Sequence, residues 1–122
     1  MIKIQQFKYP KDIDEDCIPI CNFFNTIGLK TIYSCCGHHK NFFRIVFSDE
    51  VTTENIVNFI KNYNLHCGEY KLIGQFAMWT RQVGDDIKHN WTYTIDKYED
   101  DDPVKIAYSD LTKMINFYIK EN

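Results

Sequence analysis

The sequence lacks a long hydrophobic run, an excess of basic residues and an internal repeat. No apolar stretch approaches the roughly 18 residues of a membrane helix, and the first residues are too polar for a signal peptide. A formal net charge of −3 argues against generic nucleic-acid binding, which needs a basic footprint. No internal repeat of about 20–50 residues is visible, and no linker divides the chain. We therefore expect no membrane partner and no generic nucleic-acid partner.

The chain is also poor in proline and glycine, with 3 and 5 residues, and this composition excludes a collagen-like protein. Hydrophobic residues make up 44% of the chain and aromatic residues 16%, which suits an ordinary globular protein. A length of 122 residues is typical of one domain. Area scaling indicates that roughly two-thirds of the surface is buried on folding. We expect a single α+β domain over residues 1–122.

Cysteine is present in an odd number, five, and two of the cysteines, Cys35 and Cys36, are adjacent. Together with the absence of an export signal, this favours a reducing compartment over a disulfide framework. We therefore expect a cytoplasmic protein, in the host cytoplasm if a phage encodes it. Cys17 and Cys21 lie four apart on an expected helix, where free cysteines usually behave as small buried hydrophobic residues. Cys67 has no partner at a standard zinc spacing.

Hydrophobic periodicity and turn residues predict eight elements in the order β-α-β-β-α-β-β-α. The apolar stripe from Cys17 to Ile27 is typical of a half-buried helix, and Asp110 is expected to cap the last helix. The first six elements match the ferredoxin-like plan. We therefore expect an α+β fold with a ferredoxin-like βαββαβ core, an added hairpin strand and a C-terminal helix. The expected strands span residues 1–9, 29–36, 42–47, 70–83 and 90–98.

In a fold of this kind, helices cover one face of a mainly antiparallel sheet. The other face stays open unless a partner chain covers it, so it is a candidate binding surface, and we expect a homo-oligomer formed through this face or the hairpin. The expected hairpin carries Trp79, Arg81 and Trp91, which suit a stacking platform with cationic support. The alternative is that one tryptophan lies in the core and the other in an oligomer interface.

The densest cluster of reactive side chains lies where the second expected strand ends. Its residues are Ser34, Cys35, Cys36, Gly37, His38 and His39. Gly37 permits a turn with positive φ or the close approach of a ligand. A turn of this kind exposes successive backbone N–H groups, which can hold phosphate or another anion. Because Arg44 adds positive charge nearby, the cluster is a candidate anion site.

Three other interpretations of this cluster remain open. A thiolate of Cys35 or Cys36 with an imidazole of His38 or His39 suits zinc, although further ligands at a standard spacing are missing. Alternatively, one of these thiols is activated by an imidazole and acts as the nucleophile of a hydrolase. The third interpretation is a simple β-turn with histidines on the surface.

The residues from Gly28 to His38 follow the pattern G-x-x-T-x-x-S-C-x-G-H. This pattern is similar to one found in small accessory proteins of phages and prophages. The resemblance implies an accessory protein of a phage or prophage, and such proteins often bind a host factor or sequester a nucleotide-derived defence signal. The segment also resembles the cysteine-containing turn of the wybutosine-synthesis family. That family has Arg where His38 stands, so no methyl-transfer activity is carried over.

The leading hypothesis is a counter-defence-like protein that binds and sequesters a small anionic, nucleotide-derived ligand without catalysis. Backbone amides and cationic side chains would hold a phosphate, and an aromatic face would hold the base. The alternatives are a small metal- or thiol-dependent hydrolase and a protein-only inhibitor of a host enzyme. No cofactor is expected apart from zinc in the metal alternative. The candidate ligand-binding residues are Ser34, Cys35, Cys36, Gly37, His38, His39, Arg44, Trp79, Arg81 and Trp91.

Overall fold

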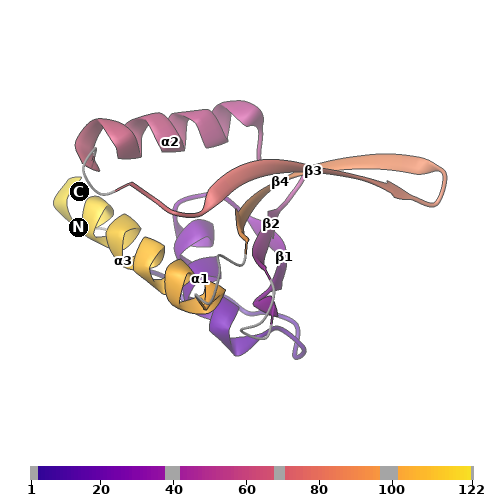
Figure 1. Ribbon diagram of the computed structural model, residues 1–122, viewed down its shortest axis with the longest axis horizontal. Coiled ribbons are helices and arrows are strands. Elements are labelled where there is room, and N and C mark those ends of the chain that lie inside the picture. Colours follow the sequence, from indigo (N-terminus) through magenta and orange to yellow (C-terminus); the bar gives the residue numbers. More distant parts are fainter. Residues whose placement is uncertain (1–2, 38–41, 68–70, 97–101, 122) are drawn as a thin grey trace.

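The computed structural model describes residues 3–37, 42–67, 71–96 and 102–121, and Figure 1 shows how their helices and strands are arranged. The strands form an antiparallel sheet in the order β1-β2-β4-β3. Helices and an antiparallel sheet together confirm the expected α+β class. In chain order the elements are η1 (Glu15–Cys17, a 3-10 helix), α1 (Ile18–Thr26), β1 (Thr31–Cys35), β2 (Phe43–Phe47), α2 (Thr53–Cys67), β3 (Gln75–Val83), β4 (Asp86–Ile95) and α3 (Pro103–Glu121).

The expected first strand, residues 1–9, does not form in the described part of that segment. The segment instead bonds to a helix side chain, since Asn22 Oδ1 of α1 accepts the backbone N–H of Phe7 at 3.2 Å and the hydroxyl of Tyr9 at 2.7 Å. Asn22 is buried in this position. A backbone donor bonded to a helix side chain is no longer available for strand pairing. The structure therefore departs from the ferredoxin-like order at its first element, and we call residues 4–10 the strap.

Aromatic rings fill the space between the helices and one face of the sheet. The ring centre of Phe24 in α1 lies 6.2 Å from that of Phe76 in β3 and 5.6 Å from that of Tyr93 in β4. The ring of Phe59 in α2 lies 5.7 Å from the same Phe76 ring, centre to centre. Figure 1 shows that the β3–β4 hairpin projects beyond the helices. We call this hairpin the arm, and we call the sheet face opposite these rings the outer face.

Asp110 joins α3 to the sheet inside this core. Its carboxylate is fully buried and accepts the N–H of Ile73 at 2.8 Å, the N–H of Gly74 at 2.7 Å and the hydroxyl of Tyr93 at 2.6 Å. The expectation that Asp110 caps the last helix is wrong, because α3 already begins at Pro103, a residue that suits the first turn of a helix. Asp110 instead fixes the chain just before β3 and thereby positions the arm.

The buried acidic groups predict a loss of stability in alkali. Burial, together with the Asp110 carboxylate, raises the pKa of Tyr93 well above its usual value, and burial raises the pKa of the Cys21 thiol from 9.0 to about 11. In the unfolded chain these groups ionise at their ordinary pKa values. Their contribution to the free energy of unfolding is therefore complete below about pH 9 and is lost progressively as the pH rises above it. We expect the free energy of unfolding to fall from pH 9 to 11, by about 1.4 kcal/mol per pH unit for each group that titrates.

Urea denaturation at a series of pH values measures this effect. The Cys21→Ala variant serves as the matched comparison, because it removes one of the groups with a raised pKa, and its stability should fall less steeply between pH 9 and 11. A stability that stays level up to pH 11 in the unchanged protein contradicts the prediction.

Candidate functional site

A hollow of about 380 Å³ lies on the outer face and receives side chains from β1, β2 and β3. Alternation along β2 explains its position, since the buried Phe43, Ile45 and Phe47 point to the core and Arg44 and Val46 point outward. The volume falls within the usual range of small-molecule sites. We call it the outer hollow, and its lining residues are Ile32, Tyr33, Cys35, Phe42, Arg44, Val46, Trp79 and Arg81.

Two arginines of the outer hollow lie against one indole ring. The guanidinium carbon of Arg44 is 5.0 Å from the centre of the Trp79 ring, and that of Arg81 is 4.2 Å from it. Arg44 also lies 4.5 Å from the centre of the Phe42 ring. Aromatic contacts of this kind orient a planar guanidinium while its N–H groups stay able to donate to an anion. Trp79 thereby holds two positive charges in one hollow.

The two guanidinium groups differ in their hydrogen bonds. Arg81 Nη1 donates to Asn90 Oδ1 at 2.8 Å, and Asn90 Nδ2 donates in turn to the Asp49 carboxylate at 2.7 Å. Arg44 Nε, by contrast, is buried and has no hydrogen-bond partner among the described residues. No carboxylate of the described ranges forms an ion pair with either arginine. A buried donor without a partner costs about 1–3 kcal/mol, so an anion that reached Arg44 would remove an existing penalty.

The structure brings several of the candidate residues together and separates others from them. Cys35, Arg44, Trp79 and Arg81 line the outer hollow. Ser34 does not, because its neighbour Cys35 faces the outer hollow and successive side chains of a strand point to opposite faces. Ser34 lines a second hollow, beside the strap.

The rest of the Ser34–His39 cluster contributes differently. Cys36 is 4% exposed and belongs to the hydrophobic core. Gly37 has the positive φ that the sequence predicts, +66°, and a side chain at this position would collide with the backbone carbonyl of Phe42. His38 and His39 lie outside the described residues, and their part in a site stays a prediction.

The two tryptophans lie on opposite sides of the sheet. Trp91 packs against the hydrophobic core, and its indole Nε1 donates to Thr53 Oγ1 at the start of α2, at 3.1 Å. Trp79 lies in the outer hollow. Of the two tryptophans expected to form a stacking platform, only Trp79 lies in the outer hollow, and a second aromatic residue there comes from another strand.

That second aromatic residue is Tyr33 of β1, which the candidate set did not include. Its side chain is 57% exposed and lines the outer hollow beside Arg44. The signal for it was present in the sequence, since alternation along the strand places Tyr33 on the same face as Cys35. Phe42 carried the same signal, because alternation along the strand expected over residues 42–47 places it on the face of Arg44, although β2 begins only at Phe43.

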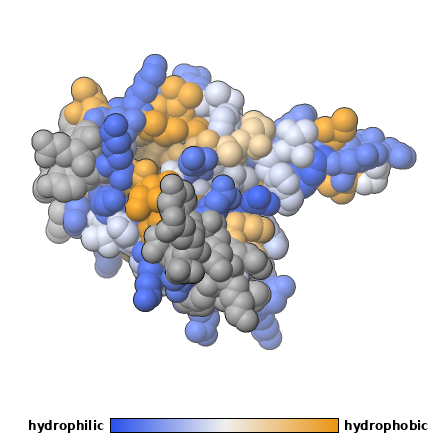
Figure 2. All heavy atoms as spheres, viewed as in Figure 1, coloured by the Kyte–Doolittle hydropathy of each residue, from blue (hydrophilic) through white to orange (hydrophobic). Residues whose placement is uncertain are grey.

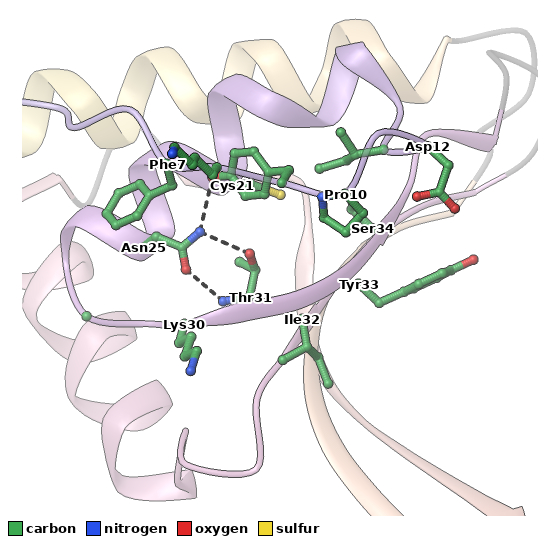
Figure 3. A pocket seen from close by; sticks show the side chains of 14 residues that line it. Phe7, Pro10, Asp12, Cys21, Asn25, Lys30, Thr31, Ile32, Tyr33 and Ser34 are labelled. Atoms are coloured by element: carbon green, nitrogen blue, oxygen red, sulfur yellow. Dashed lines mark hydrogen bonds between the residues drawn. The ribbon is translucent and has the colours of Figure 1, made fainter.

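The second hollow, of about 480 Å³, lies between the strap, α1 and β1, and Figure 3 shows its lining side chains. Its central polar group is Asn25, which accepts the N–H of Thr31 at 2.8 Å and donates to the hydroxyls of Thr31 and Tyr9, both at 3.1 Å. These bonds use the amide within the protein. The charged residues of the lining are of both signs, Lys8, Lys30 and Asp12, whereas the outer hollow has two arginines and no carboxylate in its lining, so the second hollow suits an anion less well.

Cys35 is expected to be the most reactive of the four cysteines whose side chains are described. Cys17, Cys21 and Cys36 are buried, whereas Cys35 is partly exposed in the outer hollow. Burial excludes a thiol reagent and disfavours the thiolate, and it raises the pKa of Cys17 and Cys21. In a Cys67→Ser background, Ellman's reagent should modify one thiol rapidly in the folded protein. Substitution of Cys35 by alanine should abolish that fast phase; its persistence contradicts the assignment.

The zinc alternative finds no further support in the described part of the chain. No group of three or more His, Cys, Asp and Glu side chains there is arranged to hold a metal ion. The expected imidazole ligands are those of His38 and His39, outside the described residues, so a zinc site at the Cys35–His39 turn stays a prediction. The outer hollow itself is lined by cationic, aromatic and aliphatic side chains and one thiol. This lining suits an anion better than a metal ion.

The fold and the site together define a small α+β protein whose sheet presents a cationic and aromatic hollow on the outer face. Residues 4–120 match the model of the family described as YoqC prophage protein, and the chain belongs to that family. The expected prophage origin is thereby confirmed. No curated protein and no solved structure matches the chain. None of the helices in the described ranges combines the length and the apolar run needed to cross a bilayer. The homo-oligomer and the cytoplasmic location stay predictions.

Proposed function

We propose that this prophage protein binds and sequesters a small anionic, nucleotide-derived ligand in the outer hollow without catalysing a reaction on it. The observation that carries the proposal is the pair of guanidiniums of Arg44 and Arg81 against Trp79, without a carboxylate partner in the described ranges. A protein that retains such a ligand lowers its free concentration, which is how an accessory protein can act against a nucleotide-based defence signal. The function is then stoichiometric, and its strength depends on slow release of the ligand.

The outer hollow offers separate contacts for the two parts of a nucleotide. A phosphate can accept charge-assisted hydrogen bonds from the guanidiniums, and Arg44 Nε supplies a donor that is otherwise unused. The base has a separate contact, because the exposed ring of Tyr33 offers it a stacking surface. The contacts of Trp79 with both arginines fix their positions before the ligand arrives, which reduces the entropy lost on binding.

Isothermal titration calorimetry with a panel of nucleotides, cyclic nucleotides and adenosine tests the proposal. We expect binding of phosphate-bearing compounds and at least about tenfold weaker binding of adenosine, because contacts to a charged group are worth about 1.5–3 kcal/mol. Chromatography of the released ligand should recover it unchanged. The proposal is overturned if a folded sample binds none of these nucleotides.

The thiol-dependent hydrolase is the alternative that the same experiment separates. The thiol of Cys35 lies in the outer hollow with the two arginines, so a nucleophile and an anion-binding group are neighbours there. Cleavage of a bound nucleotide, lost in the Cys35→Ala variant, would favour catalysis over sequestration. Retention of intact ligand by both forms favours sequestration.

A protein-only inhibitor is the second candidate function, and the arm is the observation that favours it. Val83 and Ile87, beside the turn of the arm, are 47% and 67% exposed. Figure 2 shows the projecting arm as mostly hydrophilic with a hydrophobic patch near its end. Exposed apolar side chains on a projecting hairpin suit insertion into a partner protein. A host protein that co-purifies with the chain and is lost in the Ile87→Ser variant would support this function, and co-purification unaffected by that variant would contradict it.

A further inference from the structure

The positive charge of the outer face continues past the outer hollow onto the arm. We propose that the ligand of this site is a nucleotide chain, with at least two nucleotides joined by phosphodiester bonds, and that its phosphates follow Arg44, Arg81 and Lys88. The inference rests on the proposed function and names the ligand class of the same site.

The first observation is a cross-strand pair of like charges. Arg81 of β3 and Lys88 of β4 are direct partners in the register of the arm, so their side chains project from the same face. Like charges in directly opposite positions destabilise a strand pair. Lys88 is exposed, and no carboxylate of the described ranges forms an ion pair with either residue. A bound phosphate between them would turn this repulsion into two attractions.

The second observation is the placement of the cationic side chains along the sheet. Arg44 and Gln75 are both level with Thr94 in the sheet, and Arg81 lies six residues beyond Gln75 along β3. Six residues correspond to about 20 Å of strand between the two backbone positions. The charges themselves are closer together, because both guanidinium carbons lie within 5.0 Å of the centre of the Trp79 ring. The side chains of Arg44 and Arg81 approach the Trp79 ring from these two ends, so the row runs from the body of the protein toward the tip of the arm.

A nucleotide with a single phosphate, such as AMP, cannot offer a separate phosphate to each of these cations. A chain carries a phosphate on each side of every internal nucleoside, and a base between two phosphates can stack on an aromatic side chain. The exposed ring of Tyr33 is available for such a base in the outer hollow. The arm projects beyond the helices (Figure 1), so a bound nucleotide chain can continue along it without meeting a helix.

The net charge of −3 and a nucleotide-chain ligand are compatible, since binding depends on the local field. The arrangement places three cations on one face. A few cations on a sheet face suit a short single strand or a cyclic dinucleotide rather than a long duplex. Both possibilities share the chemistry of linked phosphodiesters, and the experiment below distinguishes them.

Fluorescence anisotropy and calorimetry with four probes test the inference: AMP, the linear dinucleotide pApA, cyclic di-AMP and a single-stranded oligonucleotide of about eight nucleotides, within the site sizes of small single-strand binders. We expect at least one of the three linked probes to bind ten times or more as tightly as AMP. If the oligonucleotide is the tightest, the logarithm of its affinity should fall with the logarithm of salt concentration with a slope of about −2, from three phosphate contacts.

Two protein variants with the same change in charge test where the nucleotide chain binds. Lys88→Gln is expected to reduce the affinity of the tightest linked probe about tenfold and, for the oligonucleotide, to reduce the size of the salt slope by about 0.7. Lys61→Gln, on the exposed surface of α2, is the control and should change neither. Linked probes that bind no more tightly than AMP, or equal effects of the two variants, overturn the inference and leave the proposed function standing. If neither AMP nor any linked probe binds, the inference fails, and the proposed function fails with it when no other nucleotide of the calorimetry panel binds.

Discussion

Replacing Asp110 with alanine is expected to lower the free energy of unfolding by about 3–5 kcal/mol. The carboxylate is fully buried and accepts hydrogen bonds from Ile73 N–H, Gly74 N–H and the Tyr93 hydroxyl. Without it, these three groups lose their acceptor, and each buried donor without a partner costs about 1–3 kcal/mol. Urea denaturation followed by circular dichroism measures the change.

The size of this effect distinguishes a structural carboxylate from a surface one. Asp86 lies in an exposed position at the turn of the arm, and its replacement by alanine should change the free energy of unfolding by less than about 0.5 kcal/mol. If Asp110→Ala and Asp86→Ala have equal effects, Asp110 does not hold α3 to the sheet. The Asp110→Asn variant should fall between the two extremes, because its amide keeps one acceptor oxygen and places a donor where the carboxylate accepts.

Arg44→Gln is expected to weaken nucleotide binding about 10–100-fold, the largest functional effect that we anticipate from a single substitution. The substitution removes a charge held on the Trp79 ring and the buried Nε donor that has no partner in the described ranges. Arg44→Lys keeps the charge but loses the planar fork, so it should restore only part of the affinity. Calorimetry with the tightest nucleotide of the panel measures both variants.

Stability provides the control for the Arg44 variants. Because Arg44 Nε has no hydrogen-bond partner among the described residues, its removal leaves no protein acceptor unsatisfied at that atom, and the free energy of unfolding should fall by less than about 1 kcal/mol. A variant that binds weakly and folds normally places the effect in the site. If the Arg44→Gln variant binds the nucleotide as tightly as the unchanged protein does, the result contradicts a role of the outer hollow in phosphate recognition.

Local patterns in the sequence were sufficient to predict most of the helices and strands. The apolar stripe of Cys17, Ile20, Cys21 and Phe24 predicts α1 because all four side chains face the core. The strap was not predictable in the same way. Its backbone bonds to Asn22, and a buried asparagine on a helix cannot be recognised before the segment that satisfies it is in place.

The candidate site was predictable in its chemistry and less so in its assembly. Alternation along β3 places Trp79 and Arg81 on one face, but a period of two does not tell which face the helices cover. Arg44 meets Trp79 only because β2 and β3 both pair with β4, which is a contact between distant parts of the chain. The same pairing turns Trp91 toward α2, so the two tryptophans that looked like one platform lie on opposite sides of the sheet.

This separation of the two tryptophans makes one measurement decisive for the binding of a nucleotide ligand in the outer hollow. In a ¹⁵N–¹H correlation spectrum the two tryptophans give two indole N–H signals, which Trp79→Phe and Trp91→Phe variants assign. During titration with the tightest nucleotide, we expect the Trp79 signal to shift while the Trp91 signal, held by its bond to Thr53, stays in place. A saturating ligand that leaves the Trp79 signal unmoved, or moves only that of Trp91, contradicts the account.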